Sequence, residues 1–170
     1  MMKSWFLSAV AMVSVLVLGL SANSAFAADA SPFDQKMAQL STSYLKISDT
    51  LAKDSMVGVD EALQSLLSEL PNLKVADAPV AQQEGYADLP ALITAGAQGV
   101  LDAKTLADKR EAFKALSKPF ARWATVSKPG DVQLVYCSMA KGSWLQEKGP
   151  VENPYYGAEM LRCGQIIAGQ

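Results

Sequence analysis

Residues 31–51, SPFDQKMAQLSTSYLKISDTL, establish the helical character of this chain. Ser31 is a typical N-cap residue, and Pro32 suits the first helical turn because its missing N–H would have no partner there. Large apolar side chains then recur at alternating intervals of four and three residues, at Phe33, Met37, Leu40, Tyr44, Ile47 and Leu51. This spacing predicts one helix with a single buried stripe.

Three more stretches with helical periodicity follow. A second helix is expected from Val59 to Leu70 because Pro71 ends its apolar stripe, and it should pair with the first. Residues 71–84 have little periodicity and predict a connecting loop. A third helix should start at Asp88, and a fourth, capped by Asp102, should carry its apolar stripe as far as Trp123.

Two pairs of residues interrupt these helical patterns. Gly96 and Gly99 weaken the third helix and indicate close packing against a neighbouring helix. Lys109 and Arg110 break the apolar stripe of the fourth helix, and we expect both to lie on its solvent-exposed face.

The pattern changes after residue 130. Alternation through Val132, Leu134 and Tyr136 predicts a short strand, and Gln165–Ile167 predicts a second. The expected fold is therefore mainly α, a four-helix bundle with a small β-ribbon or irregular C-terminal element. Residues 28–170 are expected to form one helical domain, with a Cys/Met-containing motif in residues 131–170.

Composition narrows the classes of function. With 15 basic and 17 acidic residues among 170, the chain lacks the positive charge typical of nucleic-acid binding. The sequence has no histidine, which excludes Ser/His and Cys/His catalytic pairs and every His-based metal site. It also lacks a CxxC motif and a glycine-rich phosphate loop, so we expect no enzymatic activity.

The N-terminus has the pattern of an export signal. Lys3 precedes an apolar run from Ala9 to Leu20, and Ala25-Phe26-Ala27 forms an A-x-A cleavage site. The run is shorter than the roughly 20 apolar residues that span a bilayer. We therefore predict a signal peptide over residues 1–27 and a soluble, periplasmic mature protein with no membrane span.

Both cysteines and two methionines lie close to the C-terminus, as Cys137, Met139, Met160 and Cys163. If the two predicted strands pair antiparallel, Cys137 comes close to Cys163. Met139 follows Cys137 by two residues, and a helical turn would place Met160 on the same face as Cys163. Two thiolates and two thioethers favour Cu(I) or Ag(I) over harder ions.

A second interpretation of these four residues stays open. Two cysteines in an exported protein commonly form a disulfide, and the two methionines would then be packing residues. The disulfide Cys137–Cys163 and the metal site can also be alternate redox states of one pair.

Four C-terminal segments together resemble an uncharacterised bacterial periplasmic domain family. They are Val135-Tyr136-Cys137-Ser138-Met139-Ala140, Trp144-Leu145-Gln146, Asn153-Pro154-Tyr155-Tyr156-Gly157 and Met160-Leu161-Arg162-Cys163-Gly164. The family pattern is YCPM, a WLQ-like segment, NPYYG and MLxCG, so Ser138 stands where proline is usual. The family occurs alone and appended to CusB/HlyD-type adaptors of heavy-metal efflux systems.

The resemblance implies a role in copper or silver handling. It points to Cys137, Met139, Met160 and Cys163 as metal ligands, to Cu(I) or Ag(I) as the bound ion, and to an efflux adaptor or another periplasmic protein as partner. The alternative function is a disulfide-stapled helical module that binds another protein without metal.

Overall fold

The first helix, α1 (Pro32–Ala52), begins where the sequence predicts, because Ser31 Oγ accepts a hydrogen bond from the Asp34 N–H at 3.1 Å. It is seen in a computed structural model that describes residues 30–169. The predicted signal peptide, residues 1–27, lies outside the described residues. None of the helices within residues 30–169 is long and apolar enough to cross a membrane.

Four further α-helices follow: α2 (Val59–Glu69), α3 (Val80–Tyr86), α4 (Leu89–Asp102) and α5 (Leu106–Ser127). Short 3-10 turns, η1 (Leu70–Asn72) and η2 (Val75–Asp77), connect α2 to α3. The prediction of a loop over 71–84 is therefore partly wrong. The segment is too short to show periodicity, and α3 is anchored by one side chain, Tyr86, whose ring stacks on Phe33 with centroids 4.9 Å apart.

The fourth predicted helix starts later than expected. Its N-cap is Thr105, whose Oγ1 accepts the Asp108 N–H at 3.1 Å, whereas Asp102 is the last residue of α4. Helix α5 then continues without interruption through Pro119. Capping by Thr105 satisfies an N–H that has no partner inside the helix, which fixes the helix start.

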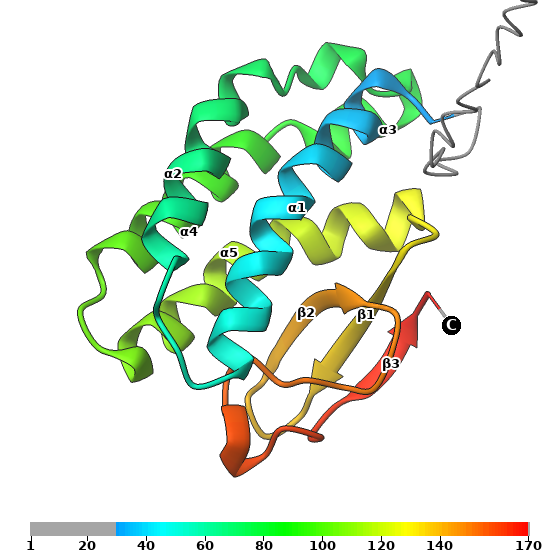
Figure 1. Cartoon of the computed structure of the whole chain (residues 1–170). Coiled ribbons are helices and arrows are strands. Elements are labelled where there is room, and N and C mark those ends of the chain that lie inside the picture. Colours follow the sequence, from blue (N-terminus) through cyan, green and yellow to red (C-terminus); the bar gives the residue numbers. More distant parts are fainter. Residues whose placement is uncertain (1–29, 170) are drawn as a thin grey trace, which may run out of the picture.

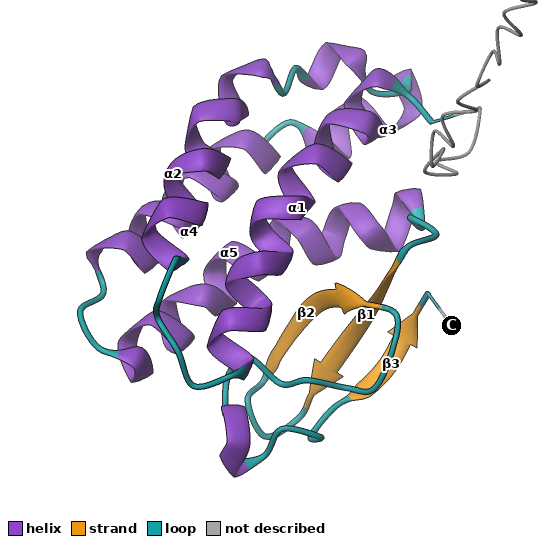
Figure 2. Ribbon diagram, in the orientation of Figure 1, coloured by secondary structure: helices purple, strands orange, loops and turns teal. Residues whose placement is uncertain are grey.

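The four longer helices form the predicted bundle, in which α1 packs along α2 and α4 packs along α5 (Figures 1 and 2). Close packing is confirmed at Gly96, where a Cβ atom would lie 2.6 Å from Leu116 Cα. At Gly99 a Cβ would meet Ala112 Cβ at an ordinary 4.0 Å. Only the first of the two glycines is therefore required by the distance between α4 and α5.

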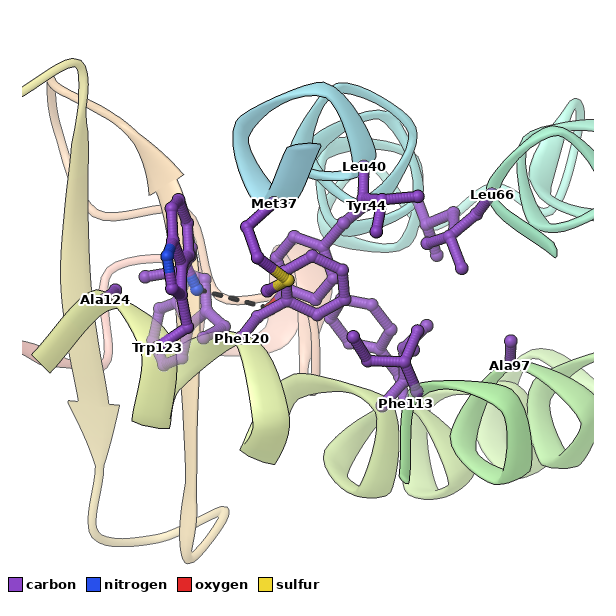
Figure 3. Packing of buried hydrophobic residues seen from close by; sticks show 14 of the residues in the cluster. Met37, Leu40, Tyr44, Leu66, Ala97, Phe113, Phe120, Trp123 and Ala124 are labelled. Carbon is purple, nitrogen blue, oxygen red and sulfur yellow. Dashed lines mark hydrogen bonds between the residues drawn. The ribbon is translucent and has the colours of Figure 1, made fainter. Parts of the chain in front are cut away.

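A stack of aromatic rings fills the core between α1 and α5 (Figure 3). The Tyr44 ring lies 4.4 Å from that of Phe120 and 5.2 Å from that of Phe113, between centroids. Its buried hydroxyl bonds Ser117 Oγ at 2.8 Å and accepts the Leu145 N–H at 3.2 Å. These bonds offset the cost of burying a phenol and connect the helices to the sheet.

The sheet has three antiparallel strands in the order β2-β1-β3: β1 (Val132–Cys137), β2 (Gly142–Glu147) and β3 (Gln165–Ala168). The predicted pairing of the first and last strands is confirmed, with Tyr136 opposite Gln165. Strand β2 was not predicted and contacts α1 and α5. In Figure 1 the orange loop after β2 crosses the sheet on its way to η3 (Gly157–Glu159).

Lys109 and Arg110 do not lie on a solvent-exposed face, so that expectation is wrong. Their side chains are only 6% and 14% exposed. Lys109 Nζ donates to Asp60 Oδ1 at 2.7 Å and to the Val100 carbonyl, in the last turn of α4, at 2.9 Å. The charge is buried because an acidic partner and a helix C-terminus meet it there.

Candidate functional site

The fold brings the two cysteines together across 26 residues of sequence, with their Sγ atoms 2.8 Å apart. Cys137 is the last residue of β1 and is 1% exposed, whereas Cys163, just before β3, is half-buried. Both are free thiols. The predicted proximity is therefore confirmed, and it follows from the antiparallel pairing of β1 with β3.

The two thiols have unequal environments. Burial acts to raise the pKa of Cys137, but hydrogen bonds from Cys163, from the N–H groups of Ala140 and Met139 and from the Asn153 side chain lower it below its ordinary value. The Ala140 nitrogen lies 3.4 Å from Cys137 Sγ. The pKa of Cys163 is raised, first by its hydrogen bond with Cys137 and second by burial.

The side chain of Asn153 organises the loop that carries Cys163. This fully buried amide donates from Nδ2 to the Cys163 carbonyl at 2.7 Å, and its Oδ1 accepts the Tyr155 N–H at 2.8 Å. Its own N–H donates to the Leu161 carbonyl at 2.8 Å. Sequence analysis did not single out Asn153 by itself, although a polar residue directly before Pro154 marks the start of such a turn.

Arg110 fastens this loop to the end of α1. Its Nη2 donates to Asp54 Oδ1 at 2.5 Å and to the Leu51 carbonyl at 2.7 Å. Its Nε donates to the Pro154 carbonyl at 3.1 Å. We call this set of contacts the Arg110 clamp. Sequence analysis missed its role, and the only signal was a cation that interrupts an apolar stripe.

Gly157 packs directly against the Arg110 clamp. Its φ of 58° lies in the left-handed region, and a Cβ atom there would collide with both Arg110 Nη2 and Asp54 Oδ1. The next residue, Ala158, donates its N–H to Asp54 Oδ2 at 3.0 Å. Hydrogen bonding to Arg110, with the Ala158 N–H second, lowers the pKa of Asp54. The loop is therefore held to the bundle at its Pro154 and Gly157–Ala158 positions.

The two methionines lie between the two cysteines in the sequence. Met139 lies in the turn after β1 and is 64% exposed, whereas Met160 is half-buried. The Cys163 N–H donates to the Met160 carbonyl at 3.0 Å, so residues 160–163 form a hydrogen-bonded turn. The structure thus brings the two cysteines into direct contact. The methionines are their neighbours in the sequence, two residues after Cys137 and three before Cys163.

Trp144 lies next to the loop of Cys163, in the protein interior. It is fully buried and pairs with Val135 across the sheet, on the face that also carries Cys137. A Cβ atom on Gly164 would lie 2.7 Å from both Trp144 Cη2 and Val135 Cγ1. The backbone beside Cys163 therefore packs directly on the indole ring, which fixes its distance from β1.

Other features of the described residues do not supply a second site. A cavity of about 640 Å³ between α1 and the end of β2 has none of the four predicted ligands in its lining. Residues 30–169 contain no group of three or more His, Cys, Asp or Glu side chains placed to hold one metal ion.

Comparison with known proteins gives one match. A family described as a protein of unknown function (DUF3347) matches residues 40–131, more than half of the chain. No curated protein and no solved structure matches. The expectation of an uncharacterised domain family is confirmed at this level, although the match covers the helices and ends before the segments from Val135 to Gly164 that suggested it.

Proposed function

We propose that this chain, which belongs to the DUF3347 family of proteins of unknown function, binds one soft monovalent metal ion. The ion is Cu(I) or Ag(I), and its ligands include Cys137 and Cys163. The observation that carries this proposal is the 2.8 Å separation of the two Sγ atoms in the reduced pair. Sulfur ligands without imidazole or carboxylate favour soft ions, because thiolates and thioethers are polarisable donors.

The surroundings of the pair support metal binding in two ways. Metal ligation requires thiolates, and the hydrogen bonds that lower the pKa of Cys137 favour its thiolate form. Asn153 and the Arg110 clamp hold the loop of Cys163 in place before any ion binds. A site that is ordered in advance loses less conformational entropy when the ion binds.

The methionines complete the proposed ligand set. Met139, on the exposed turn, can swing toward the pair because its side chain is free in solvent. Met160 belongs to the same tight turn as Cys163. The ion is then held between one buried thiolate, one half-buried thiolate and two thioethers. The two thioethers would add little to the affinity of the site for Zn(II).

The proposal extends to the cell. The protein is exported with cleavage after Ala27, acts in the periplasm as an accessory of metal efflux or homeostasis, and meets an efflux adaptor or another periplasmic protein. N-terminal sequencing of exported material tests the first step, since the mature chain should begin at Ala28. A chain that begins at Met1 contradicts it.

The same sulfur proximity supports a second candidate, a disulfide-stapled module that binds another protein without metal. Three large apolar side chains are exposed on or next to the sheet, at Tyr136, Met139 and Ile167. Such side chains are common in protein interfaces. The two candidates differ in what the reduced protein does with Cu(I).

The deciding experiment is an anaerobic titration of reduced residues 28–170 with Cu(I) in the presence of a competing chromogenic chelator. We expect the reduced parent to bind one Cu(I) ion per chain. We expect C137S and C163S each to take less Cu(I) from the chelator than the parent does. Ser138→Ala is the matched control, because Ser138 is exposed in the same turn and carries no sulfur. If the reduced parent competes no better than the C137S/C163S double variant, the stapled module replaces the metal site.

A further inference from the structure

Access to the cysteine pair is one-sided. Cys137 is 1% exposed at the end of β1, on the sheet face that also carries Trp144 and that the following loop covers at Gly164. Cys163 is half-buried, in the loop that precedes β3. Of the two cysteines, Cys163 is therefore the more accessible to a thiol that approaches from solvent.

Hydrogen-bond donors are also distributed unequally. The N–H groups of the turn after β1 point to Cys137 Sγ, with Ala140 N at 3.4 Å. Between the two thiols either sulfur can donate to the other, at an Sγ–Sγ distance of 2.8 Å. The amide groups near Cys163 serve its backbone instead, since Asn153 bonds its carbonyl and Met160 accepts its N–H. Negative charge is thus better accommodated on Cys137 than on Cys163.

We infer that the pair is a thiol–disulfide exchange site with a fixed direction of attack, in which external thiolates attack Cys163 and Cys137 is the leaving group. The sulfur atoms are already 2.8 Å apart, so oxidation joins them without rearrangement of the sheet. The external reactant is a dithiol, carried by a protein or a small molecule. The inference adds a redox regulation to the sulfur pair of the proposed function.

The reaction proceeds in two balanced steps. A thiolate of the dithiol forms a bond to Cys163 Sγ while the Cys137–Cys163 bond breaks, and the electron pair stays on Cys137 Sγ beside the Ala140 N–H. The second thiol of the carrier, once deprotonated, attacks the carrier sulfur of the mixed disulfide. This step releases the Cys163 thiolate, which takes up a proton, and leaves the carrier as a disulfide.

The direction of attack has a consequence for metal binding. In the disulfide neither sulfur is a thiolate, so the proposed ion has no anionic ligand and the oxidised pair does not bind it. Reduction through Cys163 restores the Cys137 thiolate first, inside the protein. The chain has no CxxC motif, so it is the client of a dithiol carrier and not itself the catalyst.

The test uses oxidised residues 28–170, reduced glutathione as a one-thiol probe, an acid quench, alkylation and peptide mapping, all without metal. We expect glutathione on Cys163 and the alkylating group on Cys137, with a preference of about tenfold or more. Equal labelling, a preference for Cys137, or failure of the pair to form an internal disulfide overturns the inference.

Single-cysteine variants provide a second measurement that does not depend on trapping a mixed disulfide. C137S and C163S are each converted to the glutathione mixed disulfide, their fold is checked by circular dichroism, and release by dithiothreitol is timed. Release from Cys163 should be about tenfold faster or more, because its sulfur is the accessible one. Equal rates overturn the inference. Since no metal is present, failure here leaves the Cu(I) titration of the reduced protein unaffected, and the reverse also holds.

Discussion

Replacing Gly157 by alanine tests whether the Arg110 clamp holds the loop that carries Cys163. The new Cβ atom would collide with Arg110 Nη2 and Asp54 Oδ1, which lie 2.5 Å apart in the parent. The backbone at this position has a φ of 58°, which is unfavourable for alanine. The variant must therefore both strain the turn and separate the ion pair.

Two contributions set the expected size of the effect. A left-handed conformation costs a residue with a Cβ atom about 1–2 kcal/mol. A hydrogen bond from a charged donor is worth about 1.5–3 kcal/mol, and displacement of Arg110 weakens its bonds to the Leu51 and Pro154 carbonyls. The exposed carboxylate of Asp54 is left out of the sum because solvent screens it. We expect the free energy of unfolding to fall by about 2.5–5 kcal/mol.

Urea denaturation measures this change, and Gly130→Ala is the matched control. A Cβ atom at Gly130 meets nothing within 4 Å, so its effect should stay within about 0.5 kcal/mol. The Cu(I) affinity of Gly157→Ala should also fall, because the loop of Cys163 is no longer fastened to the bundle. If both glycine variants unfold at the same urea concentration with the same slope, the clamp does not hold the loop.

Three further predictions concern the ligands, the helix packing and the response to acid. Replacing Met139 and Met160 together by leucine should weaken Cu(I) binding in the chelator competition while changing stability by less than about 1.5 kcal/mol; unchanged affinity would assign both side chains to packing. Gly96→Ala should lower stability by about 1–3 kcal/mol, despite the better helix propensity of alanine, because its Cβ would lie 2.6 Å from Leu116 Cα. Thermal unfolding measures this change. A stabilised variant would contradict the close approach of α4 and α5. Burial acts to raise the pKa of Asp34, but hydrogen bonds from two serine hydroxyls and an indole lower it below the ordinary value of 3.8. The ionised Asp34 carboxylate therefore adds to the free energy of unfolding above pH 3.8. This stabilisation is lost as the pH falls through the lowered pKa. The melting temperature of D34N should therefore decline less than that of the parent as the pH falls from 3.8 toward that pKa, and parallel declines would contradict this role.

Strand β2 and helix α3 were beyond the reach of sequence periodicity. Trp144, Leu145 and Gln146 are all buried, so β2 lacks the alternation that marks a strand with one face in solvent. Helix α3 has seven residues and one buried side chain, Tyr86, which is too little for a helical repeat. Both elements are formed because neighbours cover them, which is a property of the whole fold.

The sequence by itself determined the four longer helices, the pairing of the first and last strands, and the meeting of Cys137 with Cys163. These follow from the spacing of apolar residues along one segment and from the antiparallel order of two strands. Only the tertiary structure decided that the Arg110 side chain is largely covered, that it binds Asp54 and the Cys163 loop, and that Asn153 is enclosed there. A charged or polar side chain is stable in the interior only where distant segments supply its partners, and local spacing does not say which segments meet.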